Sequence, residues 1–117
     1  MSQQPPPRFR QVCAADDLWA GEMKEFTVGG TTIVLLRTDD ESIRAVQYVC
    51  PHQDYPLREG YFDGCTLTCA AHLWEFDAQT GRSINPDDAK LALYPVEERD
   101  GIVYVAVEGI DPYHSHA

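Results

Sequence analysis

Two short segments of the chain each bring a cysteine and a histidine close together. One residue separates Cys50 from His52, two residues separate Cys69 from His72, and sixteen residues lie between the two segments. Cysteine sulfur and histidine nitrogen are the ligands of tetrahedral zinc and of some iron–sulfur centres. Two such loops facing each other supply two sulfurs and two nitrogens, so the spacing predicts a metal site.

The distribution of these four residues distinguishes between kinds of metal site. A Cys2His2 zinc module usually groups its cysteines on one element and places its histidines roughly three to five residues apart on a helix. Here each segment mixes the two residue types. This mixing indicates one metal atom bound by Cys50 and Cys69 and a second bound by His52 and His72. A structural zinc module that only binds partners is the alternative from a different class.

The other two cysteines, Cys13 and Cys65, do not fit this spacing. Nothing in the sequence marks the chain as secreted, and cytosolic thiols are normally kept reduced, so disulfides are not expected. We expect both residues to be free thiols that are buried or half-buried.

The segments that must position the two loops have the signals of short strands. The pairs Gly29-Gly30 and Asp100-Gly101 are typical of hairpin turns. The ranges with strand-like patterns are 25–28, 31–37, 43–49, 91–97 and 102–107. Only residues 16–20 and 86–91 have a weak helical pattern, so an antiparallel all-β fold is predicted.

The stretch 51–85, which carries most of the metal motif, differs from the rest of the chain. It is rich in glycine and its strand-like pieces, 65–69 and 73–76, are brief. We interpret it as an insertion between two strands of the main sheet, and such insertions often carry a functional site. The expected organisation is one domain over residues 9–110, with the metal-binding lobe over about 47–85.

Length and composition agree with a single globular domain. The chain has 117 residues, of which 44% are hydrophobic and 24% charged. Residues 1–8 hold three consecutive prolines and are expected to be a disordered tail, and residues 111–117 a second tail. The longest aliphatic run, Ile33 to Leu36, is far shorter than the ~20 residues of a membrane helix, and no apolar leader opens the sequence. We expect a soluble, cytoplasmic protein with no membrane partner.

The net charge of the chain limits its partners. Nineteen acidic and nine basic residues give a formal charge of -10, which repels nucleic acid and anionic lipid and favours a basic patch on another protein. The sequence has no glycine-rich phosphate loop and no supported Ser-His-Asp set. We therefore do not expect the chain to turn over an organic substrate on its own.

The metal motif resembles the signature of the Rieske 2Fe-2S proteins, in which two cysteines bind one iron and two histidines bind the other. The similarity extends from about Phe9 to Glu108 and includes the segments PHQDYPLREGYFDG, LTCAAHLWEF, DAQTGRSINPDD and LALYPVEERDGIVYV. The resemblance implies the Rieske fold, an antiparallel β-sandwich body with a small inserted cluster-binding lobe. It also implies a 2Fe-2S cluster held by Cys50, His52, Cys69 and His72.

Within that family, the sequence is most similar to the ferredoxin component of multicomponent toluene and related aromatic or alkene monooxygenases. This resemblance implies an electron carrier that takes single electrons from an NADH-oxidising flavin/iron–sulfur reductase. The carrier then delivers them to a di-iron hydroxylase. The runner-up is the ferredoxin of a ring-hydroxylating dioxygenase, or a related Rieske reductase subunit.

The residues around the motif indicate a low reduction potential. Replacing two thiolates by two neutral imidazoles raises the potential from about -400 mV to roughly -150 mV or higher. In the respiratory Rieske proteins, cysteines joined in a disulfide stand at the positions of Tyr55 and Ala71, and hydroxyl side chains at those of Trp74 and Phe76. Because these hydroxyl donors are absent here, we expect a potential near the low end of the Rieske range.

Several residues beside the ligands are candidates for contact with a partner. Leu73 follows His72 at a loop tip, where the related ferredoxins usually have glycine, and Pro51 and Gln53 are expected to share this rim. Trp74 is either a docking residue or part of the core. Pro86 resembles the proline loop that covers the cluster in Rieske proteins, with a simple turn as the alternative.

Overall fold

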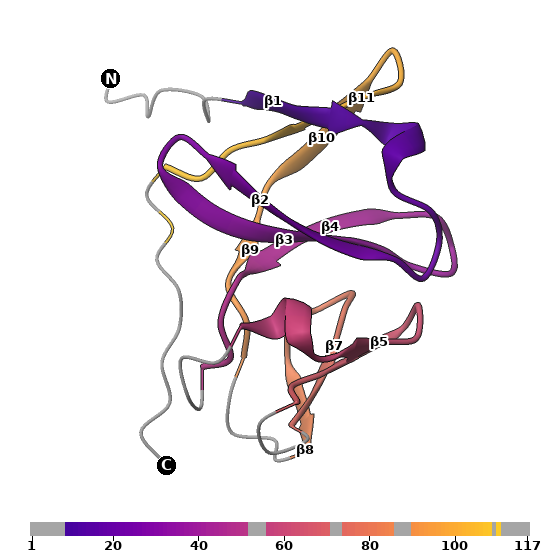
Figure 1. Ribbon diagram of the computed structural model, residues 1–117, viewed down its shortest axis with the longest axis vertical. Coiled ribbons are helices and arrows are strands. Elements are labelled where there is room, and N and C mark those ends of the chain that lie inside the picture. Colours follow the sequence, from indigo (N-terminus) through magenta and orange to yellow (C-terminus); the bar gives the residue numbers. More distant parts are fainter. Residues whose placement is uncertain (1–8, 52–55, 71–73, 86–89, 109, 111–117) are drawn as a thin grey trace, which may run out of the picture.

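The computed structural model of the chain describes residues 9–51, 56–70, 74–85, 90–108 and 110. Within these residues, eleven strands form three antiparallel sheets that stack in three layers (Figure 1). No helix in the described part of the chain is long and apolar enough to span a membrane. The observed architecture confirms the predicted all-β fold.

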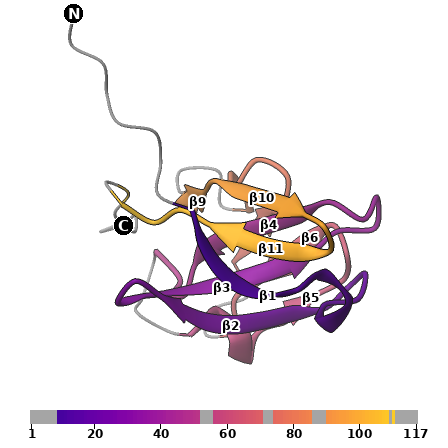
Figure 2. The same cartoon turned by 90° about the horizontal axis from the view of Figure 1, so that it is seen from above.

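Two of the sheets form the body of the molecule. The outer sheet has the order β1-β11-β10, with bounds Arg10–Ala14, Ile102–Val105 and Val96–Arg99. The central sheet has the order β2-β3-β4-β9, with bounds Met23–Val28, Thr31–Arg37, Ile43–Gln47 and Leu93–Tyr94. Figure 2 shows the outer sheet lying over the central one.

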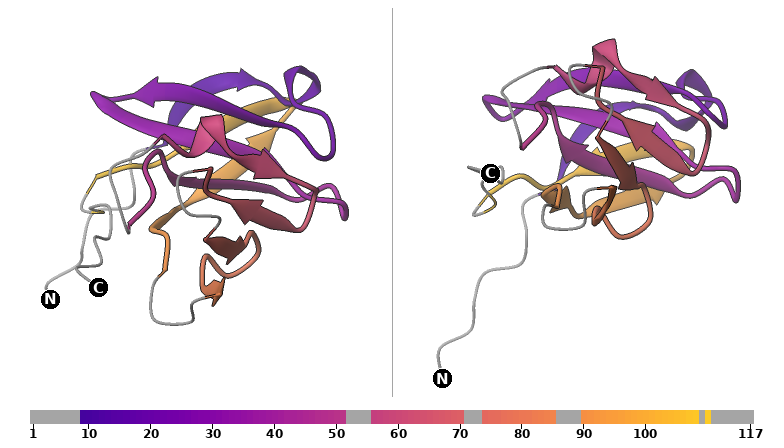
Figure 3. Two further views of the ribbon diagram at one scale, coloured as in Figure 1. Left: turned by 60° about the horizontal axis from the view of Figure 1, so that its bottom comes forward. Right: turned by 90° about the horizontal axis from the view of Figure 1, so that it is seen from below.

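The third sheet, called the lobe sheet here, covers the other face of the central sheet (Figure 3). Its order is β5-β6-β7-β8, with bounds Tyr61–Phe62, Thr66–Thr68, Glu75–Asp77 and Ser83–Asn85. Two single turns of 3-10 helix, η1 (Ala15–Asp17) and η2 (Leu57–Glu59), lie before β2 and β5. The lobe is therefore an insertion between β4 and β9, as the sequence pattern predicts.

Strand β3 is buried on both faces because it lies in the middle layer. Ile33 and Leu35 point into a first hydrophobic core between the central and outer sheets, together with Val103 and Val105 of β11. Val34 and Leu36 point into a second core, shared with the lobe. The uninterrupted aliphatic run of this strand is typical of a strand that is covered on both sides.

The turn between β3 and β4 fastens the lobe to the body. The backbone N–H of Asp39 donates to the carbonyl of Gly64 at 2.9 Å, and a Cβ at Gly64 would collide with the Asp39 carboxylate. Arg44 of β4 donates from Nη2 to Oε1 of Gln79 at 2.7 Å. These contacts hold the lobe sheet against one end of the central sheet.

The structure corrects several expected boundaries. The segment 91–97 is not one strand, because it divides at Pro95 into β9 of the central sheet and β10 of the outer sheet. Proline has no N–H for the ladder, so the chain changes sheets there. The strand expected at 43–49 ends at Gln47. The helical pattern at 16–20 is a single 3-10 turn, and the one at 86–91 falls mostly outside the described residues.

Candidate metal centre

The first cysteine–histidine segment follows the end of β4 and is closed at its base. Val49 forms an isolated antiparallel bridge with Pro56, and the N–H of Leu57 donates to the carbonyl of Tyr48 at 2.8 Å. Cys50 lies directly inside this closure and is completely buried. Its expected partner His52 lies outside the described residues.

The second segment connects β6 to β7 and is closed in the same way. The N–H of Cys69 donates to the carbonyl of Trp74 at 2.8 Å, so Cys69 begins a tight loop directly after β6. The thiol of Cys69 is almost completely buried. His72 also lies outside the described residues.

The two cysteines share one apolar environment. Cys50 and Cys69 both belong to the second hydrophobic core, where Leu57, Leu67 and Phe76 also lie. All four cysteines of the chain are described, and none of them forms a disulfide. Two thiols brought into one dry core by two closed loops are a suitable donor pair for one metal atom. The described residues thus supply two of the four expected ligands.

A third closed segment lies next to this core. Arg82 and Lys90 form an isolated antiparallel bridge, and the N–H of Leu91 donates to the carbonyl of Gly81 at 2.6 Å. Leu91 is buried in the same core as the two cysteines. The segment between the closing residues contains Pro86, which is outside the described residues.

Gln47 connects the first segment to the third, and it was not among the predicted site residues. Its side chain is fully buried, donating from Nε2 to the carbonyl of Val49 and accepting at Oε1 from the N–H of Ala92, both at 2.8 Å. The backbone N–H of Gln47 also donates to the Ala92 carbonyl. In the sequence, Gln47 is the single amide side chain in the apolar stretch 45–49. Because buried polar groups need hydrogen-bond partners, this position could have been recognised as a structural one.

Gly60 fixes the distance between η2 and the strand that leads to Cys69. A Cβ at Gly60 would collide with the carbonyl oxygen of Thr68, the residue before Cys69. The N–H of Gly60 donates to the carbonyl of Leu57 at 2.9 Å. This close backbone approach requires glycine and positions the second cysteine relative to the first loop.

The remaining cysteines have different environments from each other. Cys13 on β1 is half-buried as predicted, and burial raises the pKa of its thiol. Cys65 is exposed, so the expectation that it is buried or half-buried is wrong. It lies in the turn between β5 and β6, where Asp63 Oδ1 accepts from the N–H groups of Cys65 and Thr66. Backbone hydrogen bonds from Thr66 and Cys65 lower the pKa of Asp63.

Of the candidate docking residues, two are described. Pro51 is buried, and Trp74 is half-buried with its side chain packed against the second core. The other three candidates, Gln53, Leu73 and Pro86, lie outside the described residues. The structure adds one accessible apolar side chain in this region, because Ile84 on the edge strand β8 is 52% exposed.

Comparison with known proteins identifies the family to which the chain is similar. Residues 8–95 match the Rieske [2Fe-2S] domain. The chain is 37% identical over 109 residues to the "Alkene monooxygenase system, ferredoxin component" of Xanthobacter autotrophicus strain Py2, covering 92% of this chain and 88% of that protein.

Two solved structures have the same fold. One is the ferredoxin of carbazole 1,9a-dioxygenase from Nocardioides aromaticivorans IC177, with a TM-score of 0.78, 26% identity and coverage of 86% of this chain and 98% of that one. The other is a chain from a complex of reduced oxygenase and oxidized ferredoxin in carbazole 1,9a-dioxygenase. It has a TM-score of 0.75 and 32% identity, and covers 84% of this chain and 92% of that chain.

The donor chemistry agrees with the match, because the two buried thiols supply the cysteine pair that a Rieske centre requires. The protein therefore belongs to the Rieske [2Fe-2S] domain family, and its cofactor is a 2Fe-2S cluster.

Proposed function

We propose that Cys50 and Cys69 bind one iron of the cluster and that His52 and His72 bind the other. The observation that carries this assignment is the convergence of the two buried cysteines in one apolar core, each at the base of a closed loop. When bound, the cluster supplies a one-electron redox couple. The surrounding apolar side chains exclude water from the sulfur ligands, and the closed loops hold the two thiolates in place.

A variant series tests this ligand set. Cys69→Ser is expected to lose most of the iron and acid-labile sulfide of the purified protein, since a hydroxyl is a much weaker ligand for iron than a thiolate. Cys65→Ser is the matched control, because this cysteine is exposed and lies only four residues away. Equal iron content in the two variants would remove Cys69 from the ligand set.

We propose that the protein is a ferredoxin of a multicomponent aromatic or alkene monooxygenase. In this role it carries single electrons from an NADH-dependent flavin/iron–sulfur reductase to a di-iron hydroxylase. Support comes from the ferredoxin component of the alkene monooxygenase system, which aligns over nearly the whole chain. We place it in the cytoplasm, with residues 9–110 as one Rieske domain.

A second candidate role is supported by the solved structures. The ferredoxins of carbazole 1,9a-dioxygenase share the fold and up to 32% of the aligned sequence. In that role the protein would serve a Rieske ring-hydroxylating dioxygenase. Reconstituted turnover separates the two roles. A di-iron hydroxylase that reacts with the reduced protein many times faster than a Rieske dioxygenase supports the first, and the reverse order supports the second.

We propose that the partner docks where the two ligand loops reach the surface. In this proposal Gln53, Leu73, Trp74 and Pro86 contact the partner. Pro51 is buried, so its proposed role is to support the adjacent loop and not to contact the partner directly. Ile84 extends the apolar surface, because it is exposed on the strand that leads to Pro86. Ile84→Ser is expected to lower the rate of electron delivery and leave the reduction potential unchanged. Trp74→Ala is expected to lower the rate and also to shift the potential, because the Trp74 side chain packs against the core that holds both cysteines.

A further inference from the structure

A second candidate surface lies around Trp19. With 73% of its area exposed, Trp19 is the most exposed of the large hydrophobic side chains in the described residues. Exposed tryptophan is unusual on a monomer surface, and tryptophan is among the residues most enriched at the energetic centres of protein interfaces. An indole in this position therefore calls for a function outside the core.

The indole is held in place before any partner arrives. Its Nε1 donates to the carbonyl of Asp16 at 3.1 Å, and the backbone N–H of Trp19 donates to Oε1 of Glu22 at 2.7 Å. The N–H of Glu22 donates back to the Trp19 carbonyl at 2.9 Å. Because the side chain is already ordered, binding loses little conformational entropy.

The loop that carries Trp19 is in turn fixed to the end of β3. The N–H of Gly21 donates to the carbonyl of Arg37 at 2.8 Å, and the N–H of Arg37 donates to the carbonyl of Glu22 at 3.1 Å. The Arg37 side chain donates from Nη2 to the carbonyl of Ala15 at 2.9 Å. The loop, the turn of η1 and the end of β3 therefore form one rigid unit.

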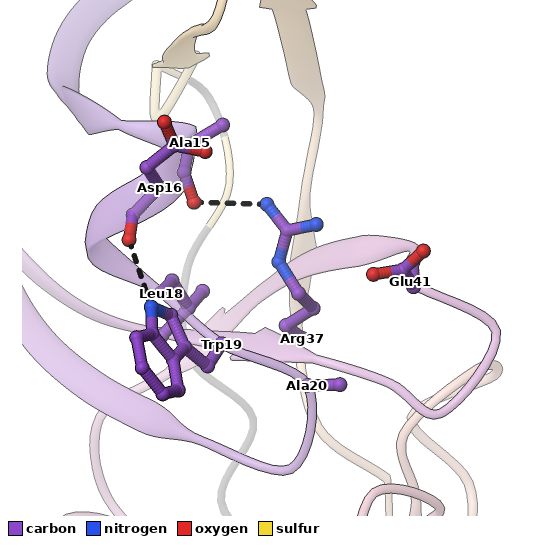
Figure 4. A pocket seen from close by; sticks show the side chains of 7 residues that line it. All are labelled: Ala15, Asp16, Leu18, Trp19, Ala20, Arg37 and Glu41. Carbon is purple, nitrogen blue, oxygen red and sulfur yellow. Dashed lines mark hydrogen bonds between the residues drawn. The ribbon is translucent and has the colours of Figure 1, made fainter.

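A pocket that is open to solvent lies beside the indole, with a volume of about 480 Å³; it is called the cavity here and can hold one long side chain. Its walls are formed by Ala15, Asp16, Leu18, Trp19, Ala20, Arg37 and Glu41. Figure 4 shows the indole and the Glu41 carboxylate on opposite sides of Arg37. Glu41 has a φ of 66° in the turn between β3 and β4, where its N–H donates to the carbonyl of Thr38 at 2.9 Å, so the turn fixes the position of this residue.

The chemistry of these walls favours a positively charged group. Asp16 and Glu41 are exposed carboxylates. Arg37 is the single basic residue of the cavity. Its Nη2 donates to the carbonyl of Ala15, and its buried Nε has no hydrogen-bond partner among the described residues, so it offers a donor to an acceptor such as a backbone carbonyl of the bound partner. The face of an indole attracts a guanidinium, and the net charge of -10 attracts basic partners from a distance. Arginine combines a cation, a flat group that stacks and a long apolar stem.

The location separates this cavity from the cysteine loops. Arg37 pairs with Ile43 at the start of β4, whereas Cys50 leaves the sheet beyond the other end of β4. Ala15 and Leu18 belong to the first core, whereas both proposed cysteine ligands belong to the second core across the central sheet. The cavity and the two cysteines therefore lie on opposite sides of the central sheet and at opposite ends of β4.

We propose that the cavity beside Trp19 binds an arginine side chain on the basic surface of a partner protein, at a site separate from the electron-transfer end. Such a contact allows one protein to hold the ferredoxin while another exchanges electrons with it. The proposal does not depend on which oxygenase the protein serves.

Nuclear magnetic resonance of the ¹⁵N-labelled holoprotein tests the proposal with a capped peptide, acetyl-Gly-Arg-Gly-amide. We expect saturable shifts of the Trp19 indole N–H and the Gly21 amide. The same peptide with citrulline in place of arginine is expected to bind at least about threefold more weakly, because it lacks the charge. No saturable shift at either position would overturn the proposal.

Variants with matched controls separate this site from general charge attraction. Trp19→Ala is expected to weaken binding about tenfold, and Tyr61→Ala, which removes an aromatic ring that is 66% exposed elsewhere, is expected to have no effect. Glu41→Gln is expected to weaken binding roughly threefold, and Glu98→Gln, with the same change of charge on β10, much less. Equal effects of Glu41→Gln and Glu98→Gln would overturn the proposal. Preferential binding of acetyl-Gly-Glu-Gly-amide would also overturn it, by assigning the cavity to an acidic group paired with Arg37.

Discussion

Replacing Gln47 by leucine removes its side-chain hydrogen bonds to the carbonyl of Val49 and from the N–H of Ala92, which connect the first cysteine–histidine segment to the third closed segment. Leucine has nearly the same volume as glutamine, so the packing of this fully buried position changes little. The carbonyl of Val49 and the N–H of Ala92 lose their partners in a region without access to water. The substitution therefore tests the hydrogen bonding of the Gln47 side chain with little change in packing.

The size of the effect follows from the cost of unpaired buried groups. Each backbone group left without a partner costs about 1–3 kcal/mol, and the more apolar side chain recovers about 1–2 kcal/mol. The net loss is about 3 kcal/mol, which corresponds to a fall in Tm of about 12 °C for a domain of this size. Because Val49 directly precedes Cys50, the cluster should also be released faster to an iron chelator.

Thermal unfolding of the holoprotein, followed by circular dichroism and by the visible absorption of the cluster, measures both effects. Ser83→Ala is the matched control, because Ser83 is also buried in this half of the molecule and its hydroxyl has no hydrogen-bond partner among the described residues. The control should lower Tm by no more than about 2 °C. If Gln47→Leu lowers Tm no more than Ser83→Ala does, the side chain of Gln47 does not stabilise the connection between the two segments.

Gly60, Asp40, His72 and the net charge of the chain each give a further prediction. Gly60→Ala should lower Tm by at least about 8 °C and reduce the cluster content, because the Cβ of the new alanine would displace the Thr68 carbonyl. Unchanged iron content in this variant would contradict the prediction. The hydrogen bond from Thr38 lowers the pKa of Asp40 to about 2, so its stabilisation is present above about pH 4 and lost as the pH falls towards 2. Asp40→Asn should therefore flatten the loss of stability below pH 4, and an identical acid profile in both proteins would refute the assignment. His72→Cys should lower the reduction potential or release the cluster, since it adds a negative ligand, and voltammetry showing the wild-type potential would exclude His72 as a ligand. Electron delivery to the proposed hydroxylase should slow as salt rises from about 0.05 to 0.5 M, whereas a constant rate would exclude electrostatic steering.

The hairpins were predictable from sequence because their turns are determined locally. Gly29 and Gly30 have φ values of 56° and 84°, and Asp100 and Gly101 have values of 52° and 77°. Two successive residues with positive φ match the twist of a two-residue hairpin, and glycine and aspartate are favoured in such turns. Each turn also determines the register of the two strands that flank it.

The short strands of the lobe were harder to predict because tertiary pairing creates them. Strand β5 of the lobe sheet contains two residues, too few for any alternating pattern, and β9 of the central sheet is equally short. In β3 and β4 both faces are covered, so no clear alternation of polar and apolar residues exists to identify the two cores.

The candidate site was accessible to sequence reasoning through ligand spacing, and its supporting contacts were not. The spacing identified Cys50 and Cys69, which the fold brings into one core. Gln47 and Gly60 act through contacts with residues distant in sequence or by close backbone approach. Such roles depend on the packed structure, so a single sequence contains only a weak sign of them.

Electron paramagnetic resonance of the dithionite-reduced protein at low temperature, recorded together with its visible spectrum, tests the central claim most directly. A coloured protein whose reduced signal has the low average g value of a 2Fe-2S centre with mixed cysteine and histidine ligands is the predicted result. A colourless protein that contains zinc, or a reduced signal typical of a cluster with four cysteine ligands, would contradict it.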